Sequence, residues 1–319
     1  MDKKFVIGVD MGGTNTVYGL VNRRGEIIAH RSFPTASEPT AEAFASRLGE
    51  NIKALISDCN ADDAVVGIGV GAPCANYFTG EIEAATDLPW PSPIPLGRLL
   101  SEATGLPVKM SNDANAAAIG EMSYGAARGL RDFIVITLGT GVGSGIVCNG
   151  QILNGNRSFG GELGHVKAWT VEDRPCGCGR KDCLQTYCSA KGVVTTARKL
   201  MAKHPESRLC LLKEEQLTSK LIAEAANAGD ETAKEVFRFT GEVLGEACAH
   251  FAAFSDPEAI IIFGGVSRAG ELLLAPLRES FDRNVLHLYR GHVTICTSEL
   301  NEADAALLGA SALGWEAEI

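Results

Sequence analysis

The amino-acid sequence predicts an α/β protein made of two lobes with a cleft between them. The chain has 319 residues, of which 45% are hydrophobic, and this length exceeds the usual size of a single domain. A pattern of strand, glycine-rich turn and strand occurs twice, over residues 5–21 and again over residues 133–148. The length and the repeated pattern together favour two lobes, and two lobes imply a cleft.

Charge and composition exclude several classes of protein. The net charge of −10 comes without the basic cluster that a nucleic-acid or anionic-membrane partner requires. The first residues, MDKKFVIGVDMGG, lack the apolar run and the cleavage site of a signal peptide, and no later segment has the length of a membrane-spanning helix. We therefore expect a cytoplasmic enzyme that acts on small molecules and has no nucleic-acid or membrane partner.

The first glycine-rich turn lies between two predicted strands, residues 5–9 and 17–21. Its polar and flexible positions are Gly12, Gly13, Thr14, Asn15 and Thr16. Because no helix follows directly, a Walker-type or dinucleotide-binding loop is excluded. Glycines expose successive backbone N–H groups, and the hydroxyl and amide side chains add donors, so the turn can bind phosphate. An ordinary glycine turn is the alternative, and Asp10 before it has the alternative role of a turn cap.

A helix and a buried strand are predicted next. Residues 41–59 predict an amphipathic helix whose apolar positions, such as Phe44, share one face. Residues 65–70 predict a buried strand that leads directly into Ala72 and Pro73.

Two polar residues, Asn112 and Asp113, precede an alanine-rich helix predicted over residues 116–124. Asn and Asp are favoured there as helix caps, which is the simplest interpretation. The helix dipole also keeps a carboxylate at this end ionised. A fixed carboxylate in a cleft can accept the proton of an attacking hydroxyl group. The two roles are compatible.

The second glycine-rich turn lies between predicted strands at residues 133–138 and 145–148. Its candidate ligand-binding positions are Gly139, Thr140, Gly141, Val142 and Gly143. A third strong strand, residues 259–263, ends in Gly264 and Gly265, which allow either close approach of a ligand or a simple turn into the next helix. Scaffold helices are predicted over residues 190–201, 219–228, 232–254, 270–280 and 301–315.

One imidazole and three thiols lie close together in the sequence, at His165, Cys176, Cys178 and Cys183. This set suits a tetrahedral zinc ion, and four protein ligands leave no open position for catalysis, so the predicted zinc is structural. The alternative is a group of buried thiols or a disulfide pair. Glycines between the cysteines favour the metal because they let the backbone fold around one ion.

These motifs resemble those of the ROK family of sugar kinases and repressors. The resemblance rests on DxGGT at the first turn, NDAN at residues 112–115, the second glycine turn, GELGH at residues 161–165, the cysteine segment and the late Gly-Gly pair. The family's cysteine pattern normally reads CxCGxxGCxE. Here Asp182 replaces the last glycine and Gln185 replaces the glutamate.

The resemblance covers essentially the whole chain and implies a ribonuclease-H-like fold of the actin, Hsp70 and sugar kinase superfamily, with an interlobe cleft. It implies a small lobe of residues 1–117 plus 300–319, whose C-terminal helix returns to it, and a larger lobe of residues 118–299 with the zinc loop and the second nucleotide motifs. It also makes a homodimer the expected assembly.

The resemblance further implies roles for individual residues. Asp113 is the catalytic base, and both glycine turns together with Gly264 and Gly265 bind ATP, with Asp10 near Mg²⁺. The sugar-binding residues are Ala72, Pro73, Asp87, Asn112, Asp113, Glu162, His165 and Gln185. Asp87 stands where relatives usually carry Asn, so it accepts but cannot donate a hydrogen bond when ionised.

The implied reaction is ATP-dependent phosphorylation of a hexose hydroxyl, with O6 of glucose as the first expectation. A kinase for N-acetylglucosamine, mannose or allose is the main alternative, because Asp87 and Gln185 depart from the family where sugar hydroxyls are read. A sugar-responsive repressor is a further alternative. Repressors of the family add an N-terminal helix-turn-helix domain, whereas this chain begins four residues before its first predicted strand. A binding-only sensor is disfavoured by Asp113.

Overall fold

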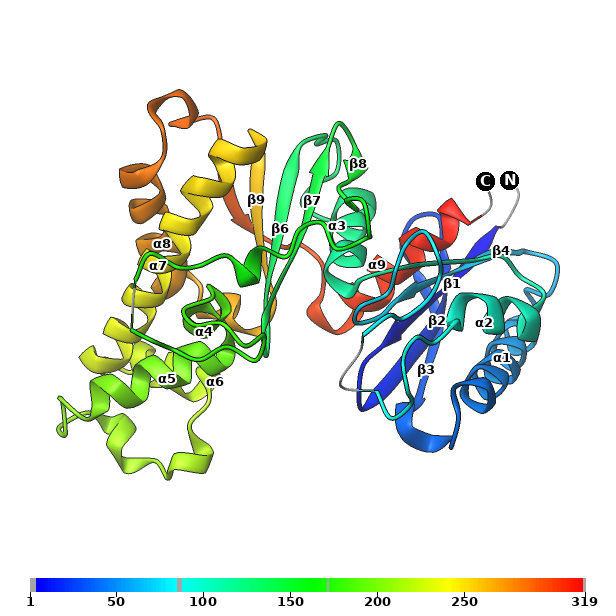
Figure 1. Cartoon of the computed structure of the whole chain (residues 1–319), viewed down its shortest axis with the longest axis horizontal. Helices are drawn as coiled ribbons and strands as arrows, with labels where there is room; N and C mark the ends of the chain where they lie inside the picture. Colours follow the sequence, from blue (N-terminus) through cyan, green and yellow to red (C-terminus); the bar gives the residue numbers. More distant parts are fainter. Residues whose placement is uncertain (1–3, 85–87, 171, 318–319) are drawn as a thin grey trace.

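Two five-stranded sheets form the centres of two lobes (Figure 1). The computed structural model describes residues 4–84, 88–170 and 172–317. The first sheet has the order β3-β2-β1-β4-β5. Its strands are β1 (Phe5–Met11), β2 (Asn15–Asn22), β3 (Ile27–Pro34), β4 (Val65–Gly71) and β5 (Val108–Ser111).

The second sheet repeats the topology of the first. Its order, β8-β7-β6-β9-β10, places an antiparallel hairpin beside two parallel strands, as in the first sheet. The strands are β6 (Phe133–Leu138), β7 (Val142–Cys148), β8 (Gln151–Ile152), β9 (Ala259–Phe263) and β10 (Thr294–Thr297). Each glycine-rich turn joins the two strands of such a hairpin, which confirms the prediction that both turns lie between strands.

Nine α-helices and six short 3₁₀ helices occur among the described residues. The α-helices are α1 (Ala41–Asp58), α2 (Leu96–Thr104), α3 (Asp113–Tyr124), α4 (Gln185–Cys188), α5 (Ala190–Met201), α6 (Ser219–Asn227), α7 (Glu231–Ser255), α8 (Glu271–Asn284) and α9 (Glu302–Glu316). The 3₁₀ helices are η1 (Thr35–Ser37), η2 (Leu163–His165), η3 (Arg208–Leu211), η4 (Glu214–Gln216), η5 (Gly265–Ala269) and η6 (His287–Tyr289). In the part of the chain that the structure describes, none of these helices is both long and apolar enough to cross a membrane.

Helices α3 and α9 lie between the two sheets and pack against each other (Figure 1). Their crossing is close because glycines meet there: a Cβ on Gly120 would lie 2.8 Å from Cα of Gly309. Helix α9 also packs on β1 and β4. A Cβ on Gly69 would lie only 1.9 Å from the carbonyl oxygen of Ala310. The small residues of the last helix therefore let it contact the first sheet at backbone distance.

Several boundaries differ from the sequence prediction. Helix α3 begins three residues earlier than predicted because the Asn112 side chain caps it and Asp113 already has helical geometry. Strand β7 begins at Val142 because the ladder with β6 continues to the Leu138–Val142 pair. Helix α2 and strand β10 were not predicted. Each is short, and α2 starts after Pro95 without a side-chain cap.

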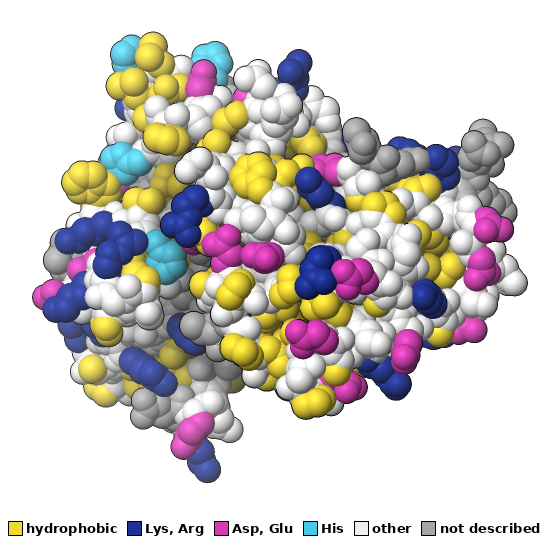
Figure 2. All heavy atoms as spheres, turned by 45° about the vertical axis from the view of Figure 1, so that its right-hand side comes forward, with side chains coloured by type: hydrophobic (Ala, Val, Ile, Leu, Met, Phe, Trp, Pro, Cys, Tyr) yellow, Lys and Arg dark blue, Asp and Glu magenta, His cyan; other side chains and the backbone are white. Residues whose placement is uncertain are grey.

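Charged side chains are distributed over both lobes. Figure 2 shows acidic side chains scattered across both lobes on the face that it draws, as the net charge of −10 leads one to expect.

We predict that Gly69→Ala destabilises the protein by about 2 kcal/mol or more, because the new methyl group forces the backbone of α9 away from β4. Chemical denaturation measures the free energy of unfolding. Gly139→Ala is the control, since no heavy atom lies within 4 Å of a Cβ at that position. An equal effect of the two substitutions would contradict the close packing of α9.

Candidate active site

A cavity of about 640 Å³ opens where the start of α3, the β6–β7 turn and the segment before His165 meet. It brings together thirteen of the predicted site residues. These are Pro73, Asn112, Asp113, Gly139, Thr140, Gly141, Val142, Gly143, Glu162, His165, Gln185, Gly264 and Gly265. Predicted sugar and nucleotide positions that lie far apart in the sequence thus share one concave surface, as expected of a small-molecule site.

The N-terminus of α3 holds Asn112 and Asp113 at this cavity. The backbone N–H of Ala114 donates hydrogen bonds of 2.8 Å to Oδ1 of Asn112 and to Oδ1 of Asp113. The predicted capping role is therefore confirmed. One oxygen of the Asp113 carboxyl group is fixed by this bond, and the side chain remains open to the cavity.

Asp10, at the end of β1, lies near Asp113. Burial, and secondly the negative charge of Asp113, raise the pKa of Asp10 to about 6. Burial also raises the pKa of Asp113, although the hydrogen bond from Ala114 opposes that shift. The charge of Asp113 thus adds to the proton affinity of Asp10, and such a pair of carboxyl groups favours either a proton on Asp10 or a bound cation.

The first glycine-rich turn lies outside the lining of the cavity, on the small lobe. The Gly12 N–H donates to the Asn15 carbonyl oxygen at 3.0 Å and closes the turn. Thr14 and Asn15 are exposed, whereas Thr16 is buried. The Thr16 hydroxyl lies 2.9 Å from the Thr35 hydroxyl, so Thr16 supports the turn from within.

Thr35 is the residue that holds this turn in place. Its hydroxyl donates to the carbonyl oxygen of Gly12 at 2.7 Å. Its backbone N–H donates to the carbonyl oxygen of Thr14 at 2.9 Å. The exposed N–H groups of the turn are therefore presented on a fixed backbone.

The second glycine-rich turn and Gly264 lie together on the large lobe. The Gly139 N–H donates to the Gly141 carbonyl oxygen, and the Gly139 carbonyl oxygen accepts from Ala190. Gly264 has a φ of 96°, and a Cβ there would lie 2.8 Å from the carbonyl oxygen of Leu138. Only glycine satisfies both conditions, so the strand end approaches β6 with bare backbone.

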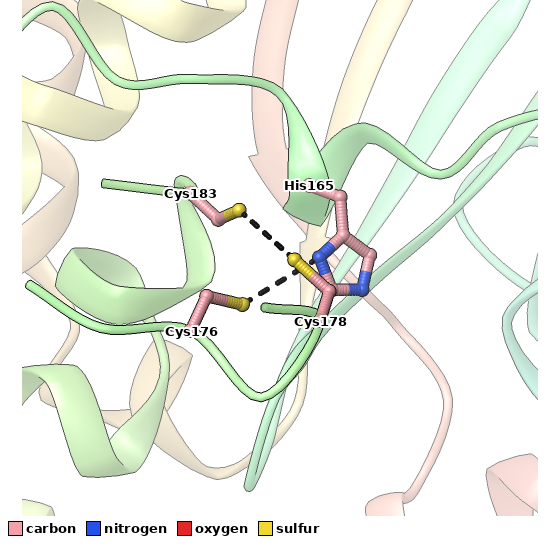
Figure 3. A group of neighbouring side chains, drawn as sticks. All are labelled: His165, Cys176, Cys178 and Cys183. Carbon is pink, nitrogen blue, oxygen red and sulfur yellow. Dashed lines mark hydrogen bonds between the residues drawn. The ribbon is translucent and has the colours of Figure 1, made fainter. Parts of the chain in front are cut away.

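His165, Cys176, Cys178 and Cys183 converge on one point (Figure 3). Their candidate ligand atoms all lie within 4.8 Å of one another. Nδ1 of His165 lies 3.7 Å from Sγ of Cys176, and Sγ of Cys178 lies 3.6 Å from Sγ of Cys183. Ligands of a tetrahedral zinc ion lie about 3.6–3.8 Å apart, given bond lengths of about 2.0–2.3 Å. The donor types and their spacing therefore fit zinc.

Asp182 explains one departure from the family pattern. Its φ of 57° lies in the left-handed region, which glycine adopts freely and aspartate tolerates. Its carboxylate accepts from the Tyr187 hydroxyl at 2.5 Å and from the Arg174 N–H at 2.9 Å. The bond from Tyr187 is the first cause of a lowered pKa for Asp182. An aspartate thus retains the turn and adds support to the loop.

Gln185 connects the cysteine cluster to the second turn. Its Nε2 donates to Sγ of Cys176 at 3.1 Å. A Cβ on Gly141 would lie 3.0 Å from its Oε1. An ionised glutamate has no proton to donate to the sulfur, so the amide makes a contact here that the family's usual residue cannot make.

Two predicted sugar positions have different outcomes. Ala72 is buried, and its N–H donates to the Ser111 carbonyl oxygen at 3.1 Å, so it positions Pro73 instead of lining the cavity. Asp87 lies outside the described residues.

Sequence reasoning missed several residues that line the cavity, among them Asn115 and Ser158. Asn115 is buried, and its Oδ1 has no hydrogen-bond partner among the described residues. Ser158 accepts a 2.8 Å hydrogen bond from the Tyr77 N–H and thereby connects the segment before η2 to the small-lobe loop after β4. The sequence signal that was available for Ser158 is the pair Asn154 and Gly155, which predicts a turn in the chain shortly before it.

Comparison with known proteins gives a family and a fold. The family model described as "ROK family" matches residues 6–317. A glucokinase of Halalkalibacterium halodurans is 38% identical over 90% of this chain and 88% of its own length, and one of Thermotoga maritima is 34% identical over 98% of both. A crystal structure of a ROK family glucokinase from Streptomyces griseus with glucose and AMPPNP is 34% identical, with a TM-score of 0.79 over 98% of this chain and 99% of that one. The fold is therefore the predicted two-lobed fold of the actin, Hsp70 and sugar kinase superfamily.

The raised pKa of Asp10 predicts a pH-dependent stability. In the folded protein this pKa is about 6, against 3.8 as the ordinary value. Between these values the folded state binds more protons than the unfolded chain, so the free energy of unfolding falls as the pH rises. We expect Asp10→Asn to raise the free energy of unfolding by about 1–3 kcal/mol at neutral pH. This gain should disappear at about pH 4.

Denaturant unfolding at a series of pH values measures this effect. Asp62→Asn removes an exposed carboxyl group of the same lobe and serves as the control. If wild type and Asp10→Asn showed the same pH dependence, Asp10 would not carry the raised pKa.

Proposed function

This chain belongs to the ROK family, and we propose that it transfers the γ-phosphoryl group of ATP to O6 of glucose. It is an ATP-dependent sugar kinase, as the glucokinases that resemble it over almost their whole length are. The observation that carries the proposal is the Asp113 carboxyl group at the start of α3, inside a cavity that also contains the second glycine turn and Gly264. A base and a nucleotide surface thus share one cavity.

Asp113 accepts the proton of the sugar hydroxyl as its oxygen attacks the γ-phosphorus. A bond forms between O6 and phosphorus, the bond from phosphorus to the β-γ bridging oxygen breaks, and ADP leaves with that oxygen. Burial raises the pKa of Asp113 and so strengthens it as a base. The hydrogen bond from Ala114 fixes one carboxyl oxygen, so the other faces the substrate.

The sugar is held by side chains from both lobes. Asn112, Glu162 and His165 line the cavity around Asp113 and supply donors and acceptors for hydroxyl groups. His165 serves both the cavity and the cysteine cluster, because its Nδ1 faces Cys176 and its Nε2 lies on the other side of the ring. Asp87 is a further proposed contact.

The nucleotide is bound by both glycine turns. The second turn and Gly264 present backbone N–H groups and close backbone approach on the large lobe, and the first turn presents Gly13, Thr14 and Asn15 from the small lobe. Since the first turn does not line the cavity, closure of the lobes is needed to bring it onto the phosphates and to exclude water.

Asp10 is the residue that we assign to Mg²⁺, since its carboxyl group feels the charge of Asp113 and carries a raised pKa that a cation would lower. When bound, Mg²⁺ neutralises charge on the phosphate oxygens. The same cation would keep Asp113 ionised and ready to accept a proton.

We propose that His165, Cys176, Cys178 and Cys183 hold one structural zinc ion. The ligand spacing described above supports this proposal. A zinc ion there would fix the segment that carries His165 and Glu162. The cytoplasmic location and the homodimer stay predictions.

The alternative substrate is another hexose, and the hydrogen bond that Gln185 makes is the observation that favours this alternative. The Gln185 amide N–H is directed to the Cys176 sulfur, which leaves its oxygen alone to read a sugar hydroxyl. One changed polar contact alters discrimination between sugars strongly.

We expect Asp113→Asn to lower kcat for glucose phosphorylation by at least about 10³-fold, because the amide cannot accept the hydroxyl proton. Its glucose affinity should stay within about threefold of wild type, since Asn can still accept the Ala114 hydrogen bond. A coupled assay measures turnover and calorimetry measures glucose binding. Turnover within tenfold of wild type would remove the base assignment.

We expect the wild type to contain about one zinc ion per chain, and Cys178→Ser to lose it together with several degrees of Tm. Elemental analysis and thermal unfolding give the two readouts. Cys210→Ser, an exposed thiol of the same lobe, is the matched control. A zinc-free Cys178→Ser protein with wild-type Tm and activity would contradict the structural zinc.

A further inference from the structure

The small lobe contains a second cavity, away from the cleft, of about 530 Å³. It lies between β2, β3 and α1, and its lining shares no residue with that of the active-site cavity. We call it the Arg31–Arg47 cavity after the two arginines that line it. The protein has a net charge of −10. A cavity lined by two guanidinium groups therefore stands out from the acidic character of the protein as a whole.

Both arginines act on the same buried phenol. Tyr18 lines the cavity but is only 3% exposed. Burial raises the pKa of Tyr18, and the positive charges of Arg31 and then Arg47 oppose that shift. The two guanidinium groups line the same cavity as Tyr18, Arg31 from β3 and Arg47 from α1.

The acidic partners of these arginines lie outside the lining of the cavity. Arg31 pairs with Asp58 at 2.5 Å and Arg47 lies 3.9 Å from Glu50, but neither acid belongs to the lining. The two acidic side chains are 61% and 69% exposed. Exposed ion pairs contribute little free energy, so an anion in the cavity can compete for the same guanidinium donors.

The rest of the lining suits a ligand with hydroxyl groups. Asn51 and the hydroxyls of Ser32 and Ser37 supply donors and acceptors, and the carboxylate of Glu38 supplies acceptors only. A carboxylate accepts hydroxyl protons of a sugar and disfavours a second anionic group. The volume is sufficient for a hexose phosphate.

We propose that the Arg31–Arg47 cavity binds the phosphate group of a small phosphate monoester or of free phosphate, with Tyr18, Arg31 and Arg47 as its phosphate ligands. Guanidinium groups bind phosphate oxygens through charge-assisted hydrogen bonds. This binding inference goes beyond the proposed kinase reaction and stands without it.

The position of the cavity connects it to the first glycine turn. Pro34, in the lining, is followed by Thr35, which bonds to Gly12 and Thr14. Glu38, also in the lining, accepts a 3.1 Å hydrogen bond from Nε1 of Trp90 through its backbone oxygen. An occupant that contacts this segment shifts the turn, and by linkage it alters the affinity for ATP. The linkage rests on the proposed function.

The binding test uses calorimetric titration with orthophosphate and, separately, with glucose 6-phosphate. The protein is first saturated with glucose and AMPPNP so that the cleft is filled. We expect one site per chain, and an affinity at least about tenfold weaker in Arg31→Gln and in Arg47→Gln, because each loses a charged hydrogen bond. If glucose 6-phosphate binds more tightly than orthophosphate, the lining also contacts the sugar hydroxyls. If both bind equally, the cavity recognises the phosphate group alone.

Arg98→Gln is the matched control, because Arg98 is an exposed arginine on α2 of the same lobe that pairs with Glu102 at 2.9 Å. It should leave binding unchanged. Binding of neither ligand to the saturated wild type, or an equal loss in Arg98→Gln, would overturn the proposal.

The linkage test compares AMPPNP affinity with and without the phosphate ligand, in wild type and in Arg47→Gln. We expect a shift of about fivefold in wild type and none in the variant. Unchanged AMPPNP affinity in wild type would overturn the linkage. If AMPPNP did not bind at all, the proposed function would fail. The Arg31–Arg47 cavity would still be tested in that case, by titrating wild type and Arg47→Gln with phosphate in the absence of AMPPNP.

Discussion

The site depends on the placement of two carboxyl groups near each other, Asp10 at the end of β1 and Asp113 at the start of α3. Burial, and secondly the charge of Asp113, raise the pKa of Asp10, and this shift lowers the stability of the protein at neutral pH. Backbone packing places them together, because Asp10 on β1 pairs with Gly71 on β4, and a Cβ on Gly71 would lie 3.9 Å from Cα of Asp113. The proposed Mg²⁺ ion would offset this cost by neutralising the charge of the pair.

The two sheets share one topology, and each presents one glycine turn between its first two strands. The large lobe brings its turn, Gly264 and His165 into a single cavity, whereas the small lobe holds its turn outside it. In the proposed mechanism the nucleotide and the sugar bind to open lobes, and phosphoryl transfer follows when the lobes close and complete the phosphate contacts.

Sequence reasoning succeeded where the signal is local. The glycine turns, the cap of α3 and the His165 and cysteine set lie in short segments whose residue types restrict the backbone or the chemistry. The structure brings the second turn, the start of α3 and His165 into one cavity, and it groups His165 with the three cysteines. Sequence reasoning failed where the role depends on distant contacts. The burial of Thr16 against Thr35, the interlobe bond of Ser158 and the pairing of Arg31 with Arg47 around Tyr18 arise only from tertiary packing. The left-handed backbone at Asp182 is an intermediate case. The sequence indicated a turn there, but it did not reveal the hydrogen bonds that the Asp182 side chain makes.

The most direct test of the central claim is the transfer of labelled γ-phosphate from ATP by the purified protein, with glucose, N-acetylglucosamine, mannose and allose compared at equal concentration. Nuclear magnetic resonance of the product identifies the phosphorylated oxygen. The account predicts the highest kcat/KM for glucose, with phosphate on O6. No transfer to any of these sugars would contradict a kinase, and preferred transfer to one of the other three would contradict glucose as the substrate.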